Sequence, residues 1–162
     1  MRIIAYTSEL RDGSVFIEEN TGETVLSSDI GELLNFLVEP FEDSMKICWS
    51  LPDFTAPILR LLDRASCQKL WQNKRLVIPP FKVFYVPGKI FSITHIPSKT
   101  TSSIYELEQY FPGVETTDID TLTILGQKLM IELKKMRLTP HTLSSPVAIY
   151  NECILSQLDL PT

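Results

Sequence analysis

The sequence predicts a mixed α/β domain, in which helices pack on the faces of one β-sheet. The N-terminal residues alternate between polar and apolar side chains, as in a β-hairpin. A nearly continuous apolar run at 45–51 is typical of a strand buried on both faces, and helical periodicities separate and follow the strands. The 162 residues are 44% hydrophobic and 22% charged, without an internal repeat. We therefore predict a single domain over residues 1–162.

The first elements follow from alternation, turn residues and one capping pair. Asp29 followed by Glu32 forms a capping box, which starts a helix whose apolar residues recur at helical spacing. Pro40 ends that helix, because proline cannot continue the hydrogen-bond ladder. The predicted elements are a strand at 2–10, a turn at 11–13, a strand at 14–20, a turn at 20–22, a helix at 29–39 and a central strand at 45–51.

The remaining elements are predicted from proline positions and helical spacing. Pro57 fits a helix only in its first turn, so the helix after the central strand is expected to begin near Phe54. Pro87 and Gly88 suit a type II turn between two strands. The predicted elements are helices at 54–65 and 66–73, a strand at 74–81, a hairpin at 82–96, a polar loop at 97–103, and helices at 104–111, 115–136 and 138–158.

Charge and cysteine usage restrict the function classes. The net charge of -5 and the pI near 5.0 give no basic field over the whole chain, which argues against strong autonomous DNA binding. The three cysteines are odd in number and lie in apolar or helical surroundings, so we expect reduced core residues in an intracellular protein. Trp49 and Trp71 are likewise expected in the core. Without a signal-peptide pattern or an apolar run of roughly 18 residues, we predict a cytoplasmic protein that contacts no membrane.

Acidic side chains occur at the ends of several predicted elements. In "AYTSEL", Thr7 and Glu9 lie two residues apart, so both point to one face of the first strand. In "CWSLPDFTAPILRLL", Ser50 and Asp53 follow the central strand. The layout and these strings resemble the 3′–5′ exonuclease domain of family B DNA polymerases, particularly the protein-primed kind. The resemblance implies a ribonuclease H-like fold: an α/β structure with a mixed β-sheet flanked by helices.

That family has a D-x-E pair on its first strand, and an asparagine and an aspartate after the central strand. Here Glu9 matches the glutamate, but Thr7 stands in the place of the first aspartate. Ser50 stands in the place of the asparagine and Asp53 lies near that of the second aspartate. A shift of the alignment by one residue would put Phe54 in the place of that acid instead.

The family also has a tyrosine and an aspartate four residues apart on a late helix. Both Asp118 and Asp120 could match this aspartate. At about 100° per residue, Asp118 falls on the inward stripe that Leu122 begins, whereas Asp120 points almost the opposite way. Asp118 is therefore the better match, with Val114 in the place of the tyrosine.

The resemblance implies that Glu9, Asp53 and Asp118 are the catalytic and metal-binding residues. In the family, such carboxylates hold two divalent metals that activate water for phosphodiester hydrolysis. The first aspartate bridges both metals, and the neutral Thr7 offers a hard cation no comparable ligand. We therefore expect a degenerate exonuclease-like domain that no longer cuts or cuts very poorly, and that needs no cofactor if catalysis is lost.

Each acid also has a structural interpretation. Glu9 at a strand end is compatible with a solvated charge, and Asp118 with a first-turn residue that the helix dipole favours. Asp53 is expected to be the N-cap of the helix after the central strand, whether or not it is also a metal ligand.

Three functions remain open from the sequence. The first is a degenerate exonuclease-like domain of a DNA polymerase-like protein, acting as a scaffold or as a nucleic-acid or protein contact. The chain would then be the N-terminal part of a longer protein, with single-stranded DNA or the following polymerase domain as partner. The second is an active 3′–5′ exonuclease, in which the three carboxylates hold Mg²⁺ or Mn²⁺ and converge within a few ångströms. The third is an unrelated α/β interaction module, whose three acids would lie on different faces.

Overall fold

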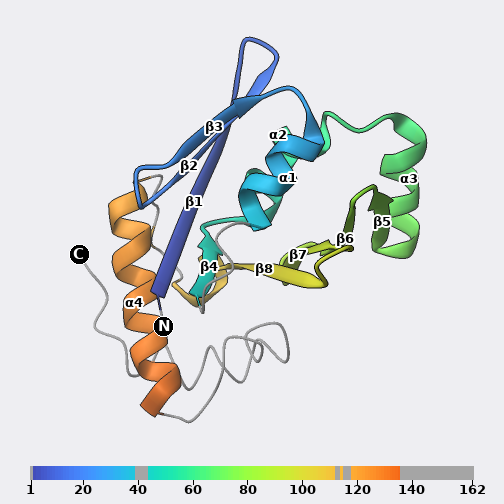
Figure 1. The fold of residues 1–162 in the computed structure, drawn as a ribbon. Coiled ribbons are helices and arrows are strands. Elements are labelled where there is room, and N and C mark those ends of the chain that lie inside the picture. Colours follow the sequence, from blue (N-terminus) through green and yellow to red (C-terminus); the bar gives the residue numbers. More distant parts are fainter. Residues whose placement is uncertain (1, 39–43, 112–113, 115–117, 136–162) are drawn as a thin grey trace.

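The structure is a computed structural model, and it describes residues 2–38, 44–111, 114 and 118–135. Its strands form one eight-stranded mixed sheet in the order β3-β2-β1-β4-β8-β7-β6-β5 (Figure 1). The central strands β1, β4 and β8 are parallel, and the other neighbours pair antiparallel. The strands are β1 (Arg2–Arg11), β2 (Ser14–Glu19), β3 (Thr24–Ser27), β4 (Ser44–Cys48), β5 (Arg75–Ile78), β6 (Phe81–Val86), β7 (Ile90–His95) and β8 (Thr100–Glu106).

Within the described residues, four α-helices flank the sheet and give it two apolar cores. Helices α1 and α2 cover the face that carries Ile4 and Tyr6, whereas α4 covers the opposite face, with Ile3 and Ala5 (Figure 1). Strand alternation explains this division, because successive side chains of β1 point to opposite faces. The predicted α/β fold is confirmed, and the arrangement is compatible with a ribonuclease H-like sheet. The helices are α1 (Ile30–Val38), α2 (Leu51–Leu59), α3 (Arg64–Asn73) and α4 (Ile119–Lys135), with a 3₁₀ turn η1 (Glu108–Tyr110).

A glycine lets α4 approach the sheet closely. A Cβ atom on Gly126 would lie 2.4 Å from Ile47 Cδ1 and 3.2 Å from Ile3 Cγ2. Both isoleucines are buried in the core beneath α4, so their side chains have little room to move. The absent side chain therefore sets the distance between α4 and the strands β1 and β4.

The structure differs from the prediction at residues 97–111, where it contains strand β8. A polar loop at 97–103 and a helix at 104–111 were expected, but Thr100–Glu106 form a strand between β4 and β7. Its hydroxyl groups find partners across the sheet: Ser103 Oγ lies 2.9 Å from Ser92 Oγ, and Thr101 Oγ1 lies 2.9 Å from Thr94 Oγ1. These cross-strand pairs let a polar segment form a strand next to the centre of the sheet.

Other predictions also need correction. Strand β3 was not predicted, and α2 begins at Leu51, so that Pro57 lies inside the helix and not in its first turn. Cys67 and Trp71 are exposed and not in the core, with 73% of Trp71 accessible to solvent. The predicted helix at 138–158 lies outside the described residues.

The buried Lys46 of β4 anchors the C-terminus of α1. Its Nζ atom donates hydrogen bonds to the carbonyl oxygens of Leu37 and Val38, at 2.6 and 3.3 Å. These carbonyls belong to the last turn of α1, where no helical N–H remains to bond them. Burial lowers the pKa of Lys46 from 10.5 to about 8, although the nearby Glu19 carboxylate partly opposes this shift.

None of the helices in the described ranges combines the length and the apolar character that crossing a membrane requires.

We predict that Gly126→Val lowers the free energy of unfolding by about 1–3 kcal/mol, because the added side chain overpacks the contact with Ile47. Gln127→Val adds the same side chain to an exposed position of α4 and should change stability by less than about 0.5 kcal/mol. Urea unfolding of the two variants measures the difference. Equal stabilities would show that the close approach of α4 is not a packing constraint.

We also predict that Lys46→Met changes how stability depends on pH. The folded chain binds the Lys46 proton less tightly than the unfolded chain, so wild-type stability should rise as the pH increases from about 8 toward 10.5. The variant lacks this contribution. Between pH 7.5 and 9.5, the free energy of unfolding of the wild type should therefore increase by about 1–2 kcal/mol more than that of the variant. Parallel pH profiles in urea unfolding would contradict the burial of a charged Lys46.

Candidate functional site

A cavity of about 490 Å³ lies beyond the carboxyl end of β4, beside the second half of β1. Residues from β1, β2, the junction between β4 and α2, and the start of α4 line it. All three acids predicted as site residues are among them, although they come from distant parts of the chain. The polar and charged lining residues are Thr7, Ser8, Glu9, Arg11, Glu18, Ser50, Asp53 and Asp118.

Strand β1 supplies Thr7 and Glu9 to the cavity. The two residues lie two apart on a continuous strand, so both point to the α4 face of the sheet, as the sequence predicts. Ser8 lies between them on the other face, where its hydroxyl donates to the carbonyl oxygen of Phe54 at 2.6 Å. This bond ties β1 to α2. Glu9 is exposed and forms a salt bridge with Arg11, whose guanidinium carbon lies 3.8 Å from the centre of the Phe16 ring.

Asp53 lies in the first turn of α2 and is not its N-cap, contrary to the sequence prediction. Ser50 is the N-cap, and its side chain accepts a hydrogen bond from the Asp53 backbone N–H at 3.5 Å. The helix begins three residues before Phe54 because Pro52 fits its first turn, where no helical N–H is needed. The exposed Asp53 carboxylate therefore remains near the positive end of the helix dipole, at the wall of the cavity.

Asp118 immediately precedes α4 and bonds its first turn. Its carboxylate accepts hydrogen bonds from the Asp120 backbone N–H at 3.2 Å and from the Thr121 hydroxyl at 2.9 Å. The Thr121 hydroxyl and then the Asp120 N–H lower the pKa of Asp118 below its usual value. Asp118 lines the cavity, and Asp120 is not among its lining residues in the described part of the chain. The choice of Asp118 over Asp120 as the family's aspartate stays a prediction. Val114, at the position of the family's tyrosine, packs against the core beneath α4.

Glu106 does not line the cavity, but it supports the start of α2 beside it, and the sequence prediction missed this role. It ends β8 and is buried, and its Oε1 atom accepts a hydrogen bond from the backbone N–H of Leu51 at 2.8 Å. Burial raises the pKa of Glu106, the Leu51 N–H opposes this, and the charges of Glu108 and Asp53 raise it further. Correct assignment of β8 would have placed Glu106 at the same end of the sheet as Cys48, its partner in the β4–β8 register. Because the sequence analysis predicted a helix at 104–111, it did not place Glu106 at this end of the sheet.

Cys48 lines the cavity, and its surroundings disfavour the thiolate form of its side chain. Cys48 is buried, and burial raises the pKa of its thiol well above the usual value. The neighbouring charges of Glu106, Asp53 and Glu108 raise it further. A protonated thiol is a poor nucleophile, so the chemistry of the cavity depends on its carboxylates and hydroxyl groups. The half-buried Trp49 also lines the cavity, which gives it one aromatic wall.

The described residues do not form a ready metal site. Among residues 2–38, 44–111, 114 and 118–135, no group of three or more His, Cys, Asp or Glu side chains could hold a metal ion. Glu9, Asp53 and Asp118 share the cavity without forming such a group, and Thr7 adds only a neutral hydroxyl. Their assignment as metal ligands therefore stays a prediction.

Comparisons with models of protein families, with curated proteins and with solved structures found no match for this chain.

Proposed function

We propose that this chain is a degenerate 3′–5′ exonuclease-like domain of a DNA polymerase-like protein, which does not hydrolyse nucleic acid and acts as a scaffold or contact. One observation carries the proposal: Thr7, Glu9, Asp53 and Asp118, from three separate elements, line a single cavity beyond the end of the parallel strand β4. A site that gathers carboxylates in this place is what a nuclease of this kind requires. The fold by itself supports no function.

Three features of the cavity favour the loss of catalysis. Thr7 cannot supply the negative charge that a bridging aspartate would give to two cations. Arg11 pairs with Glu9, so a metal ion would have to displace a guanidinium from that carboxylate. Both carboxylate oxygens of Asp118 accept hydrogen bonds from the first turn of α4, which reduces its availability as a ligand. These features support the proposal that the cavity is a nuclease site that has lost its ligand chemistry.

Two other functions account less well for these observations. An active exonuclease would bind Mg²⁺ or Mn²⁺ through Glu9, Asp53 and Asp118. These carboxylates would then have to converge on one ion, and lining the same cavity does not by itself bring them that close. An unrelated α/β interaction module would have its three acids on different faces. That expectation does not fit a cavity lined by all three.

We predict that the wild-type chain does not digest a labelled single-stranded oligonucleotide with Mn²⁺ present. The Asp53→Ala, Asp118→Ala double variant controls for contaminating nuclease. Cleavage by the wild type that needs both Mn²⁺ and these two acids would overturn the proposal and establish the active exonuclease. Cleavage that persists in the double variant would be attributed to contamination.

We also predict that Thr7→Asp creates a Mn²⁺ site, because the new carboxylate would join Glu9, Asp53 and Asp118 in the same cavity. Millimolar Mn²⁺ should raise the melting temperature of this variant by several degrees more than that of the wild type. Thr24→Asp places the same change on an exposed position of β3, outside the residues that line the cavity, and should show no such gain. Adding Asp118→Ala should remove the effect. If Thr7→Asp responds no more than Thr24→Asp, the cavity does not derive from a metal site and the interaction module becomes the better account.

A further inference from the structure

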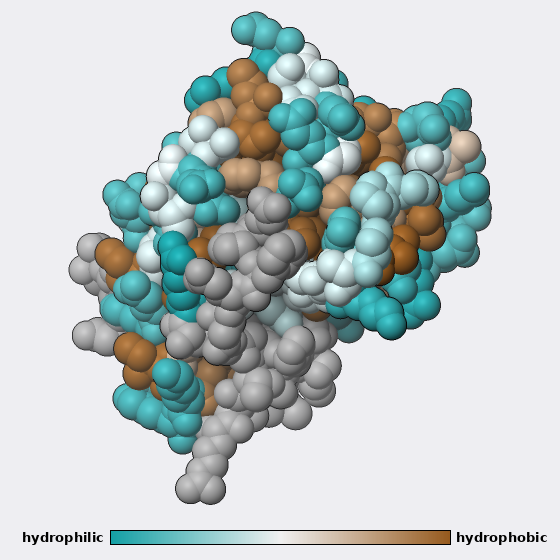
Figure 2. Space-filling model, in the orientation of Figure 1, coloured by the Kyte–Doolittle hydropathy of each residue, from teal (hydrophilic) through white to brown (hydrophobic). Residues whose placement is uncertain are grey.

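Charge is distributed very unevenly along this acidic chain. Between Asp53 and Glu106 the sequence contains eight lysines and arginines and one acid, Asp63, whereas the remainder contains seven basic and nineteen acidic residues. The single acid, Asp63, is occupied, because its carboxylate accepts a hydrogen bond from the Ser66 N–H as the N-cap of α3. This basic segment runs from α2 through α3, β5, β6 and β7 to β8, and α3, β5, β6 and β7 lie together at one side of the molecule (Figure 1). Hydrophilic residues cover much of this side in Figure 2.

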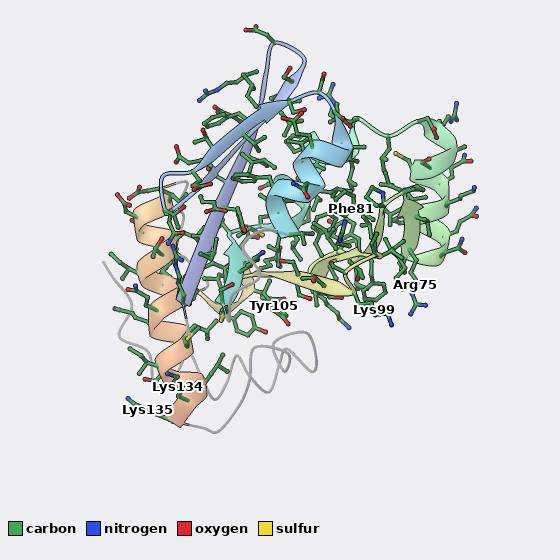
Figure 3. All side chains as sticks on the ribbon, viewed as in Figure 1. Arg75, Phe81, Lys99, Tyr105, Lys134 and Lys135 are labelled. Carbon is green, nitrogen blue, oxygen red and sulfur yellow. The ribbon has the colours of Figure 1, made fainter. Side chains whose placement is uncertain are left out.

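The outer strands present two faces of different character. Phe81, Val83 and Tyr85 of β6 are buried toward α1 and α2. The side chains between them point the other way, and Figure 3 shows Phe81 on one side of the sheet, with Arg75 and Tyr105 on the other. We call this second side the open face; it comprises Arg75 and Val77 of β5, Lys82 and Phe84 of β6, Ser92 and Thr94 of β7, and Thr101 and Ser103 of β8, none of which is buried.

The strand register arranges the open face in two parallel rows. In the first row, Arg75 pairs with Phe84, which pairs with Ser92, which pairs with Ser103 of β8. In the second row, Val77 pairs with Lys82, then Thr94, then Thr101. With about 4.8 Å between strands, each row spans about 14 Å. Each row therefore offers one cation, one apolar side chain and one pair of hydroxyl groups.

The cations of the open face are available to a partner. Arg75 and Lys82 are exposed, and no carboxylate among the described residues forms a salt bridge with either. The guanidinium carbon of Arg75 lies 5.5 Å from the centre of the Phe84 ring, so a cation and an aromatic ring adjoin in one row. Lys89 and Lys99, in the turns at the two ends of β7, add exposed charge beside the rows. Figure 3 places Lys99 on the same side of the sheet as Arg75.

We propose that the open face binds single-stranded nucleic acid. Cations beside an aromatic ring suit such a strand, because phosphates contact the cations while an unpaired base stacks on the ring. The hydroxyl rows provide donors and acceptors for phosphate oxygens or sugars. An acidic protein segment would use the cations but not the ring, and it is the alternative that the experiment below excludes. The inference deepens the proposed function and rests on it for the role of a contact domain, but its surface lies outside the cavity.

The test is fluorescence anisotropy of a labelled 20-nucleotide oligo-dT strand titrated with the full chain at 50 mM salt. Arg75→Glu with Lys82→Glu should weaken binding at least tenfold and reduce the slope of log affinity against log salt by about 1.4, since two phosphate contacts are lost. Lys134→Glu with Lys135→Glu makes the same charge change at the end of α4, at the other end of the molecule in Figure 3, and should change affinity less than twofold. Thermal melting verifies that each variant is folded.

A milder variant separates stacking from charge. Phe84→Leu keeps an apolar side chain but removes the ring, so it should weaken binding severalfold and leave the salt slope unchanged. A polyglutamate peptide should not compete with the oligonucleotide. Absence of wild-type binding, equal losses in both charge-reversed variants, or full competition by polyglutamate would each overturn the proposal.

The same assay distinguishes this inference from the proposed function. If binding depends on the open face but Thr7→Asp gains no Mn²⁺ response, the nucleic-acid surface stands and the exonuclease origin fails. If Thr7→Asp gains a Mn²⁺ site and the oligonucleotide does not bind, the opposite conclusion follows.

Discussion

The buried ends of α1 and α2 impose the constraint on which the rest of this fold depends. Backbone groups at helix ends have no intrahelical partner, and these ends meet the sheet away from solvent. Side chains of the parallel strands satisfy them: Lys46 and Ser102 both donate to the Leu37 carbonyl oxygen, and Glu106 accepts from the Leu51 N–H. The cation lies at a helix C-terminus and the acid at an N-terminus, as the helix dipole favours. Burial of these polar groups is tolerated because each is bonded.

These bonds also determine the shape of the cavity. Glu106 fixes the start of α2, which places Ser50 and Asp53 at one wall. Gly126 brings α4 close to β1 and β4, which places Asp118 at another wall, opposite the strand that carries Glu9. The scaffold thus holds acidic side chains at fixed positions, independently of whether they perform chemistry. Under the proposed function, Thr7 would stand in the place of a metal ligand while the packing around it is kept.

The cavity and the open face lie in different parts of the molecule and differ in charge. The cavity gathers acids at one end of the parallel strands, whereas the open face presents Arg75 and Lys82 on the outer strands. Because exposed charges are screened beyond roughly 10 Å at ordinary salt, a basic region can attract phosphates although the whole chain is acidic. The net charge excludes a uniform basic field but not a local one. The proposed open face is therefore compatible with the net charge of -5.

The sequence by itself determined the strands and helices that have a clear local pattern of apolar residues. It also allowed a choice between candidate site residues where strand or helix geometry distinguishes them. Alternation identified β1 and placed Thr7 and Glu9 on one face, and helical spacing preferred Asp118 over Asp120. Only the tertiary structure decided β8, because its hydroxyl residues become strand residues through partners on β7. The role of Glu106 depends on that strand, and its bond to Leu51 joins residues 55 positions apart. Propensity and periodicity describe neighbours in sequence, whereas the partners that satisfy buried polar groups come from distant parts of the chain.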